Sequence, residues 1–173
     1  MKSLPRLLSI YKSVHLNKHN VITHFIGIPL ILWSAALLFA TFSVEIFSIK
    51  TNAMQLLAVL IFAYYLILDV KLGSVAILLI GPIWLHAQSY AASENAYWLA
   101  ALVFVIGWIF QFIGHYYEKA KPAFFDDLKQ LLIGPLFLVA ELCFALGLFT
   151  SLEHKVTEQA LALRADIDHN VTA

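Results

Sequence analysis

The strongest constraint on the fold of this chain is a series of long apolar segments. They cover approximately residues 21–43, 53–68, 74–90, 96–117 and 128–150. A helix of about 20 apolar residues crosses the hydrocarbon layer of a bilayer, and these segments reach or approach that length. The sequence is 61% hydrophobic and only 13% charged, whereas a soluble domain is typically ~45–50% apolar and ~25% charged. We therefore predict an all-α, polytopic membrane helix bundle with four to five spans.

Basic residues gather on both sides of the first four segments. Lys2, Arg6, Lys12 and Lys18 precede the first segment, and Lys119, Lys121 and Lys129 follow the fourth. Because Lys and Arg concentrate on the cytoplasmic side of membrane proteins, both regions are expected there, which four intervening spans allow. A Gly-Pro pair and Glu141 leave open whether the fifth segment crosses or re-enters the membrane. We expect one membrane domain over residues 1–150 and a polar tail over residues 151–173.

The stretch before the first span predicts a short amphipathic helix over residues 4–15. Its apolar face is formed by Leu4, Leu7, Leu8, Tyr11 and His15. Such a helix lies in the membrane interface or packs on the rest of the protein, and the two are compatible. Residues 16–20 interrupt it, and Asn20 is predicted to cap the next helix. Residues 43–52 are expected to form a polar connection, and residues 70–73 a tight turn.

Charge and cysteine content exclude two classes of function. The formal net charge is zero and no large basic block is present, so nucleic acid is not expected as a partner. Cys143 is the only cysteine of the sequence, which rules out an intramolecular disulfide and argues against a cysteine metal site.

The fourth apolar segment ends in polar residues that share one helical face. At about 100° per residue, Gln111, His115 and Glu118 fall on the same side as Trp108. Polar and ionisable groups are costly in lipid, so they usually face a protein interior or a cavity. We expect this face to point away from lipid.

Four of the seven histidines are expected at one membrane face: His15, His19, His24 and His115. Neutral imidazole is the commonest protein metal ligand, and several at one level could hold Fe, Zn or Mn. His15 and His24 would lie on opposite sides of one continuous helix, so they can converge only if the chain breaks between them. Residues 17–20 supply that break. His86 lies deeper, about 20 Å into the third segment, where a Gly-Pro pair could bend the helix.

Other interpretations of these residues stay open. A single membrane histidine often serves as an interhelical hydrogen-bond donor, and His19 could be an exposed interfacial residue. Glu118 could be a ligand, a partner that orients a ligand, or a surface acid. A transporter with a polar path, or a membrane scaffold without catalytic activity, are the alternative functions.

Two segments carry a resemblance to a known family. The segments His15-x4-Asn20-x3-His24-x-Ile-Gly-Ile-Pro29 and Trp108-x2-Gln111-Phe-Ile-Gly-His115-x2-Glu118-x3-Pro122-Ala123 resemble signatures of the Mpo1-like family. Similar features continue through Asp126-Asp127, Gly134-Pro135 and Glu141. The resemblance covers roughly residues 7–150, nearly the whole membrane part.

The resemblance implies an Fe(II)-dependent dioxygenase that removes one carbon from 2-hydroxy fatty acids and releases CO2. The implied iron ligands are His15, His24 and His115, with His86, His19 or Glu118 completing the shell. Gln111 and Glu118 are the implied catalytic residues, and Gln111 would orient oxygen or carboxylate. The expected partners are the fatty acid, O2 and membrane lipid, with a homo-oligomer left open. The expected location is the inner membrane of a bacterium or the endoplasmic reticulum of a eukaryote.

Overall fold

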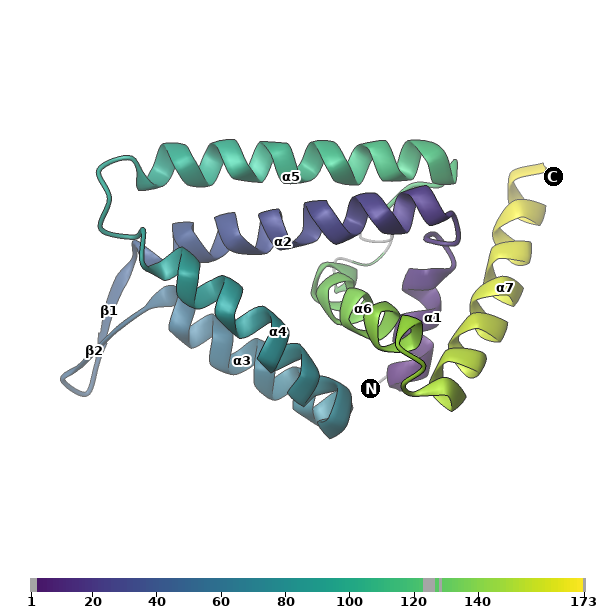
Figure 1. Cartoon of the computed structure of the whole chain (residues 1–173), viewed down its shortest axis with the longest axis horizontal. Helices are drawn as coiled ribbons and strands as arrows, with labels where there is room; N and C mark the ends of the chain where they lie inside the picture. The colour runs from purple at the N-terminus through teal and green to yellow at the C-terminus, as the bar shows by residue number, and fades with distance from the viewer. Residues whose placement is uncertain (1–2, 123–126, 128, 173) are drawn as a thin grey trace. The chain divides into compact units, whose positions relative to one another are not determined.

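The computed structural model describes residues 3–122, 127 and 129–172 of the chain, and it is predominantly helical (Figure 1). Its helices are α1 (Leu4–Lys12), α2 (Lys18–Ala40), α3 (Ala53–Leu68), α4 (Val70–Gln88), α5 (Ala96–Glu118), α6 (Gln130–Ala145) and α7 (Thr150–Thr172). The strands β1 (Ser43–Ile46) and β2 (Ile49–Asn52) form a small antiparallel hairpin. The predicted all-α membrane class is confirmed. Ala123 and Asp126, which belong to the motifs quoted above, lie outside the described residues.

Three of the described helices are long and apolar enough to cross a membrane, namely α2, α4 and α5. Helices α3 and α6 are also apolar, but each has 16 residues. A helix of that length covers about 24 Å at 1.5 Å per residue, less than the ~30 Å hydrocarbon layer. The count of four to five spans therefore stays a prediction.

The contacts divide the chain into two compact units. The first contains Met1–His24 and Ile113–Ala173, and the second contains Phe25–Phe112. Helices α2 and α5 each contribute residues to both.

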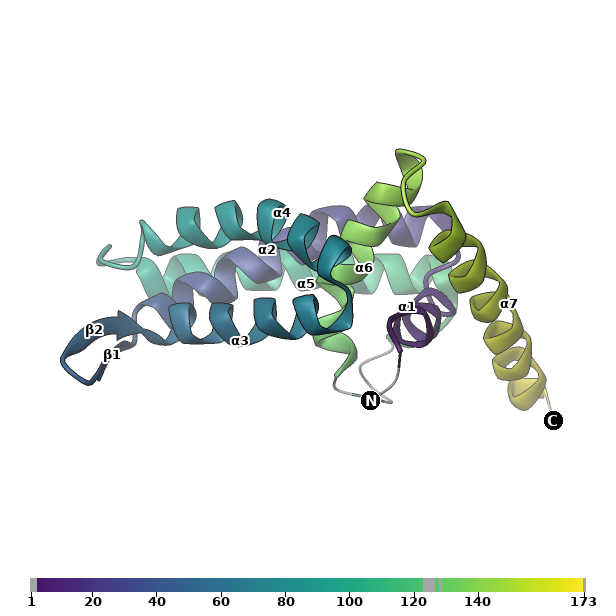
Figure 2. The same cartoon turned by 90° about the horizontal axis from the view of Figure 1, so that it is seen from below.

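In the first unit, α1 packs against α6 and α7 (Figures 1 and 2). The apolar face of α1, which includes Leu4, Leu7, Leu8 and Tyr11, is buried as the sequence predicts. The helix ends at Lys12, three residues earlier than expected. His15 therefore does not extend the apolar face of α1 and lies in the connection to α2.

The break between α1 and α2 depends on Asn17. Its side-chain oxygen accepts a hydrogen bond from the backbone N–H of His19 at 2.9 Å, and its carbonyl accepts one from Val21. Asn17 thus caps α2, and the prediction that Asn20 has this role was wrong. Since α2 begins at Lys18, Asn20 lies within the first turn, where its side chain is free to bond elsewhere.

The second unit contains two hairpins. In the first, residues 43–52 form the β1–β2 pair, with Phe47 and Ser48 at positive φ in the turn. In the second, α3 and α4 lie side by side (Figures 1 and 2). The Asp69 side chain accepts a hydrogen bond from the backbone N–H of Leu72, so α4 starts directly after it. The polar connection expected at 43–52 is thus a β-hairpin, and the tight turn expected at 70–73 was wrong, because these residues begin α4.

Within the second unit, α2 and α5 approach each other closely at two glycines. A Cβ atom added to Gly27 would lie 2.7 Å from the carbonyl oxygen of Gly107 and would overlap the Nε2 atom of Gln111. Gln111 is buried, and its Nε2 has no hydrogen-bond partner among the described residues. As expected, the Gln111 side of α5 faces protein in this region.

Candidate metal centre

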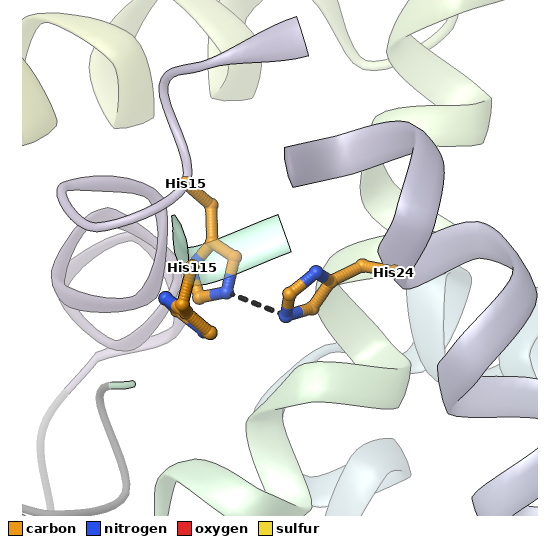
Figure 3. Close-up of side chains that lie close together, drawn as sticks. All are labelled: His15, His24 and His115. Atoms are coloured by element: carbon orange, nitrogen blue, oxygen red, sulfur yellow. Dashed lines mark hydrogen bonds between the residues drawn. The ribbon is translucent and has the colours of Figure 1, made fainter. Parts of the chain in front are cut away.

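Three histidines from separate parts of the first unit meet in its interior. His15 comes from the connection after α1, His24 from the second turn of α2, and His115 from the last turn of α5 (Figure 3). One ring nitrogen of each lies within 4.8 Å of the others, and all three side chains are buried. No other group of this kind occurs in the part of the chain that the structure describes. The expected convergence of these three histidines is therefore present.

The backbone orients all three rings in the same way. The Nδ1 atoms of His15, His24 and His115 lie 2.6, 2.9 and 3.2 Å from the carbonyl oxygens of Tyr11, Asn20 and Ala120. A carbonyl oxygen only accepts hydrogen bonds, so each Nδ1 must carry the proton. The Nε2 atom of each neutral ring is then the nitrogen with a free lone pair. Fixing the tautomer through the second ring nitrogen is what metal-binding histidines require.

The closest nitrogen pair fits a metal better than a proton. The Nε2 atoms of His15 and His24 lie 3.0 Å apart, and two acceptors at that distance repel each other unless a cation lies beside them. Burial lowers the pKa of His15 well below its ordinary value, and the neighbouring His24 and His115 lower it further. A proton is therefore disfavoured.

Aromatic packing fixes the position of His15. The Tyr11 ring stacks on it with centroids 4.1 Å apart and planes at 5°. Phe137 on α6 contacts both rings. The rings of His24 and His115 meet His15 edge to face, at 4.5 and 4.8 Å. An imidazole packed on several sides has little rotational freedom, so its Nε2 atom is held in place before any metal binds.

Glu118 organises the backbone beside the histidines. Its carboxylate accepts hydrogen bonds from the backbone N–H groups of Leu16 and Asn17, at 3.1 and 2.8 Å, and from the Asn20 amide at 3.1 Å. Arg164 on α7 forms an ion pair with it at 2.9 Å. These four contacts use both carboxylate oxygens. Glu118 thus ties the connection that carries His15 to the end of α5, next to His115.

Arg164 was not predicted as a site residue, because it belongs to the polar tail. Its guanidinium also donates to the carbonyl oxygens of Ser13 and Glu118, at 3.3 and 3.2 Å. The side chain therefore contacts both the start of the connection, at Ser13, and the end of α5, at Glu118. No local sequence signal marks it, since it is one of two Lys or Arg residues spread over a mixed polar helix.

The remaining predicted site residues are not members of this histidine group. His86, in the second unit, is exposed, and its Nδ1 accepts a hydrogen bond from the Trp33 indole at 2.9 Å. Gln111 also belongs to the second unit. His19 is exposed and contacts the Tyr117 ring. None of the three belongs to the histidine group described above.

The fold and the site together define a class of protein. The chain is a helical protein of the membrane-bundle class, with three helices long and apolar enough to cross a bilayer and a buried three-histidine group that could hold a metal ion.

Comparison with known proteins gives the family. The model of the family described as "2-hydroxy-palmitic acid dioxygenase Mpo1-like" matches residues 1–146, so the chain belongs to the Mpo1-like family. It is 35% identical over 164 residues to the 2-hydroxy-palmitic acid dioxygenase MPO1 of Saccharomyces cerevisiae, and the match covers 91% of each chain. No solved structure matches the chain. This relationship supports the assignment of the chain as a dioxygenase.

Proposed function

We propose that this chain is an Fe(II)-dependent dioxygenase that shortens 2-hydroxy fatty acids by one carbon. The observation that carries the proposal is the group of three buried histidines, each held by a backbone carbonyl at Nδ1 and open at Nε2. The name of the yeast relative supports the reaction type and the substrate class. Nitrogen ligands of this kind suit iron as well as zinc or copper, and oxygen chemistry favours iron among them.

The proposed reaction balances without a further reductant. One 2-hydroxy acid and one O2 give a carboxylic acid one carbon shorter, one CO2 and one water. The bond between the carboxyl carbon and C2 breaks, and C2 is oxidised from an alcohol to a carboxylic acid. O2 accepts all four electrons.

His15, His24 and His115 would hold the iron through Nε2. Iron held there would supply the activation of O2 and a Lewis acid for the substrate oxygens. The protein itself would hold the ligand rings in position and exclude water from the site. The backbone carbonyls fix the rings, and the buried surroundings keep water away from the reacting centre.

Glu118 would act as a positioning residue. Its four polar contacts leave little capacity for a metal, and they order the connection that places His15. We therefore propose that Glu118 supports the ligands, which was one of its expected roles.

Further roles for His86 and Gln111 stay predictions. Since Trp33 occupies the Nδ1 atom of His86, only Nε2 could bind iron. The iron affinity of His86→Ala decides this: a loss of about tenfold or more would place His86 in the shell, and an unchanged affinity would exclude it. For Gln111→Ala, a lower kcat with unchanged iron content would support an orienting role.

The decisive experiment is reconstitution of the purified full chain with Fe(II) under anaerobic conditions, followed by O2 and 2-hydroxypalmitate. We expect one iron per chain, O2 uptake and pentadecanoic acid. His24→Ala should lose at least about 100-fold in iron affinity and show no turnover. His154→Ala is the matched control, because His154 is an exposed histidine on α7. An iron-loaded wild-type chain that forms no shortened acid would contradict the proposal.

We also propose that the protein is an integral membrane protein, with the active site reached by substrate from the lipid phase. Three apolar helices of sufficient length support this. Alkaline carbonate extraction of membranes tests it, since an integral protein stays in the pellet.

A further inference from the structure

A cavity of about 320 Å³ opens beside His15 in the first unit. That volume is at the lower end of the ~300–1,000 Å³ typical of small-molecule sites. Three charged side chains, Lys12, Lys18 and Glu141, line it together with His15. The cavity therefore joins a charged wall to one of the proposed iron ligands.

Lys12 is the more buried of the two lysines in this wall. Its ammonium group forms an ion pair with Glu141 of α6 and lies 5.9 Å from the centre of the Phe137 ring. The side chains of Lys12 and Glu141 are only 13% and 17% exposed. An ammonium carries three N–H donors, and one contact with Glu141 leaves donors for a second anion. Lys12 is thus held in a fixed position and still has N–H donors available for an anionic ligand.

The charges favour an anion. Among the charged side chains of the wall, two lysines against one glutamate leave one net positive charge. A partly buried cation attracts an anion more strongly than an exposed one, because solvent screens it less. The cavity should therefore select ligands that carry a negative charge.

The rest of the lining is apolar. Leu16, Val21 and Ile22 complete the cavity, and Ile22 is 58% exposed on α2, at the surface of a candidate membrane span. A ligand that fits has an anionic head at Lys12 and a hydrocarbon chain that leaves past Ile22. A single-chain fatty acid has this form.

We propose that this cavity binds the carboxylate of a long-chain fatty acid, with Lys12 as its counter-ion. The inference rests on the proposed function, because the fatty acid is then the substrate, held with its first carbons beside His15. Lys12 would make the enzyme select acids over alcohols of the same length. Glu141 would hold Lys12 in place while competing with the ligand for its charge.

Because Glu141 and the ligand compete for Lys12, substitutions of Lys12 and of Glu141 should change the ligand affinity in opposite directions. A purely structural ion pair would not produce opposite changes. Palmitate is a suitable probe because it lacks the 2-hydroxyl group of the proposed substrate. Its binding to the purified full chain in detergent is measured by calorimetry, before and after treatment with a chelator. Lys12→Met should weaken palmitate binding at least about tenfold, as expected for a lost hydrogen bond to a charged group. Glu141→Gln should tighten it severalfold.

Controls separate the site from general effects. Lys12→Arg should keep most of the affinity, and Lys155→Met, at an exposed position of α7, should keep all of it. Hexadecanol should bind all variants alike, which shows that Lys12→Met still folds. The double variant Lys12→Met/Glu141→Gln, which leaves no unpaired charge, should bind palmitate as weakly as Lys12→Met.

Three outcomes would overturn the inference. They are equal palmitate affinity of wild type and Lys12→Met, weaker binding in Glu141→Gln, and displacement of palmitate by phosphatidylglycerol vesicles that depends on Lys12. The last would assign the cavity to lipid phosphate. Lys12-dependent palmitate binding in a chain that does not oxidise 2-hydroxypalmitate would support the site and contradict the proposed function. If Lys12→Met leaves the oxidation of 2-hydroxypalmitate unchanged, the proposed function would be supported and the Lys12 site contradicted.

Discussion

At the scale of single residues, the backbone alone orients the three histidines. His15 and His24 each bond the carbonyl oxygen of the residue four positions earlier, and His115 bonds a carbonyl five positions later. No acidic side chain is needed to fix the tautomers. The site is therefore sensitive to small displacements of the backbone, and the closest packing beside it lies at Gly114.

We predict that Gly114→Ala reduces metal affinity while leaving the helices intact. A Cβ atom there would overlap the side chains of Thr23 and Asn20, and it would lie 3.1 Å from Nδ1 of His24. To accommodate the methyl group, the Thr23 and Asn20 side chains must move, which disturbs the Asn20 hydrogen bonds to Val14 and Glu118 unless the start of α2 shifts and carries His24 with it. Disturbing the support of metal ligands typically costs 10- to 100-fold in affinity. Fe(II) titration together with circular dichroism measures both effects.

Gly81→Ala is the matched control for this prediction. Gly81 also lies in an apolar helix, but a Cβ atom there meets nothing within 4 Å. Its replacement should leave metal affinity unchanged and, by helix propensity, stabilise α4 by up to about 1 kcal/mol. An unchanged metal affinity in Gly114→Ala would contradict the close packing described here.

The sequence contains enough information to predict which histidines meet, but not what surrounds them. His15 and His24 can converge because asparagines interrupt the helix between them, and His115 ends an apolar segment whose polar face must avoid lipid. By contrast, Arg164 and Glu118 are 46 positions apart, and Lys12 and Glu141 are 129 positions apart. No periodicity links such pairs, since only the packing of α1, α6 and α7 brings them together.

At the scale of secondary-structure elements, α7 supports the site from outside the part of the chain that the family model matches. That match ends at residue 146, and α7 begins at Thr150. The helix nevertheless packs on α1, and its Arg164 reaches Glu118. The sequence alone suggests only a polar tail, because the interactions of α7 with the rest of its unit are not encoded in an apolar stripe.

We predict that Arg164→Met destabilises the first unit. Glu118 is only 3% exposed in its side chain and Arg164 20%, so the substitution leaves a buried carboxylate with fewer partners. Losing a hydrogen bond to a charged group costs about 1.5–3 kcal/mol. The free energy of unfolding should fall by about that amount, and bound iron should dissociate faster. Thermal unfolding and chelator-induced iron release measure the two effects.

Two further variants locate the effect at the ion pair. Arg164→Lys should recover part of the stability, because an ammonium keeps the charge but cannot donate as a planar fork. In Arg164→Met/Glu118→Gln the buried charge is gone, so the two substitutions should cost less than the sum of their separate effects. Strict additivity would mean that Arg164 acts through other contacts.

At the scale of the whole molecule, one proposed ligand is distant in the sequence from the other two, yet all three belong to one unit. His15 and His24 precede residue 25, and His115 follows residue 112, while the α3–α4 hairpin and the β1–β2 hairpin belong to the other unit. Apolar segments predict the helices well because each segment is long. They do not predict this division, which depends on how helices of similar composition pair.

We predict that metal binding protects the two units unequally. A ligand that binds only the folded state adds about 2.7 kcal/mol of stability at 100 times its Kd, and it acts on the segments that it joins. In hydrogen-exchange measurements, Fe(II) should slow the amides of residues 13–24 and 113–119 most, and those of the β1–β2 hairpin least. His24→Ala should abolish the difference, and His154→Ala should keep it. Equal protection of both units in the wild type would show that they unfold together, and would contradict a metal-dependent stability confined to the first.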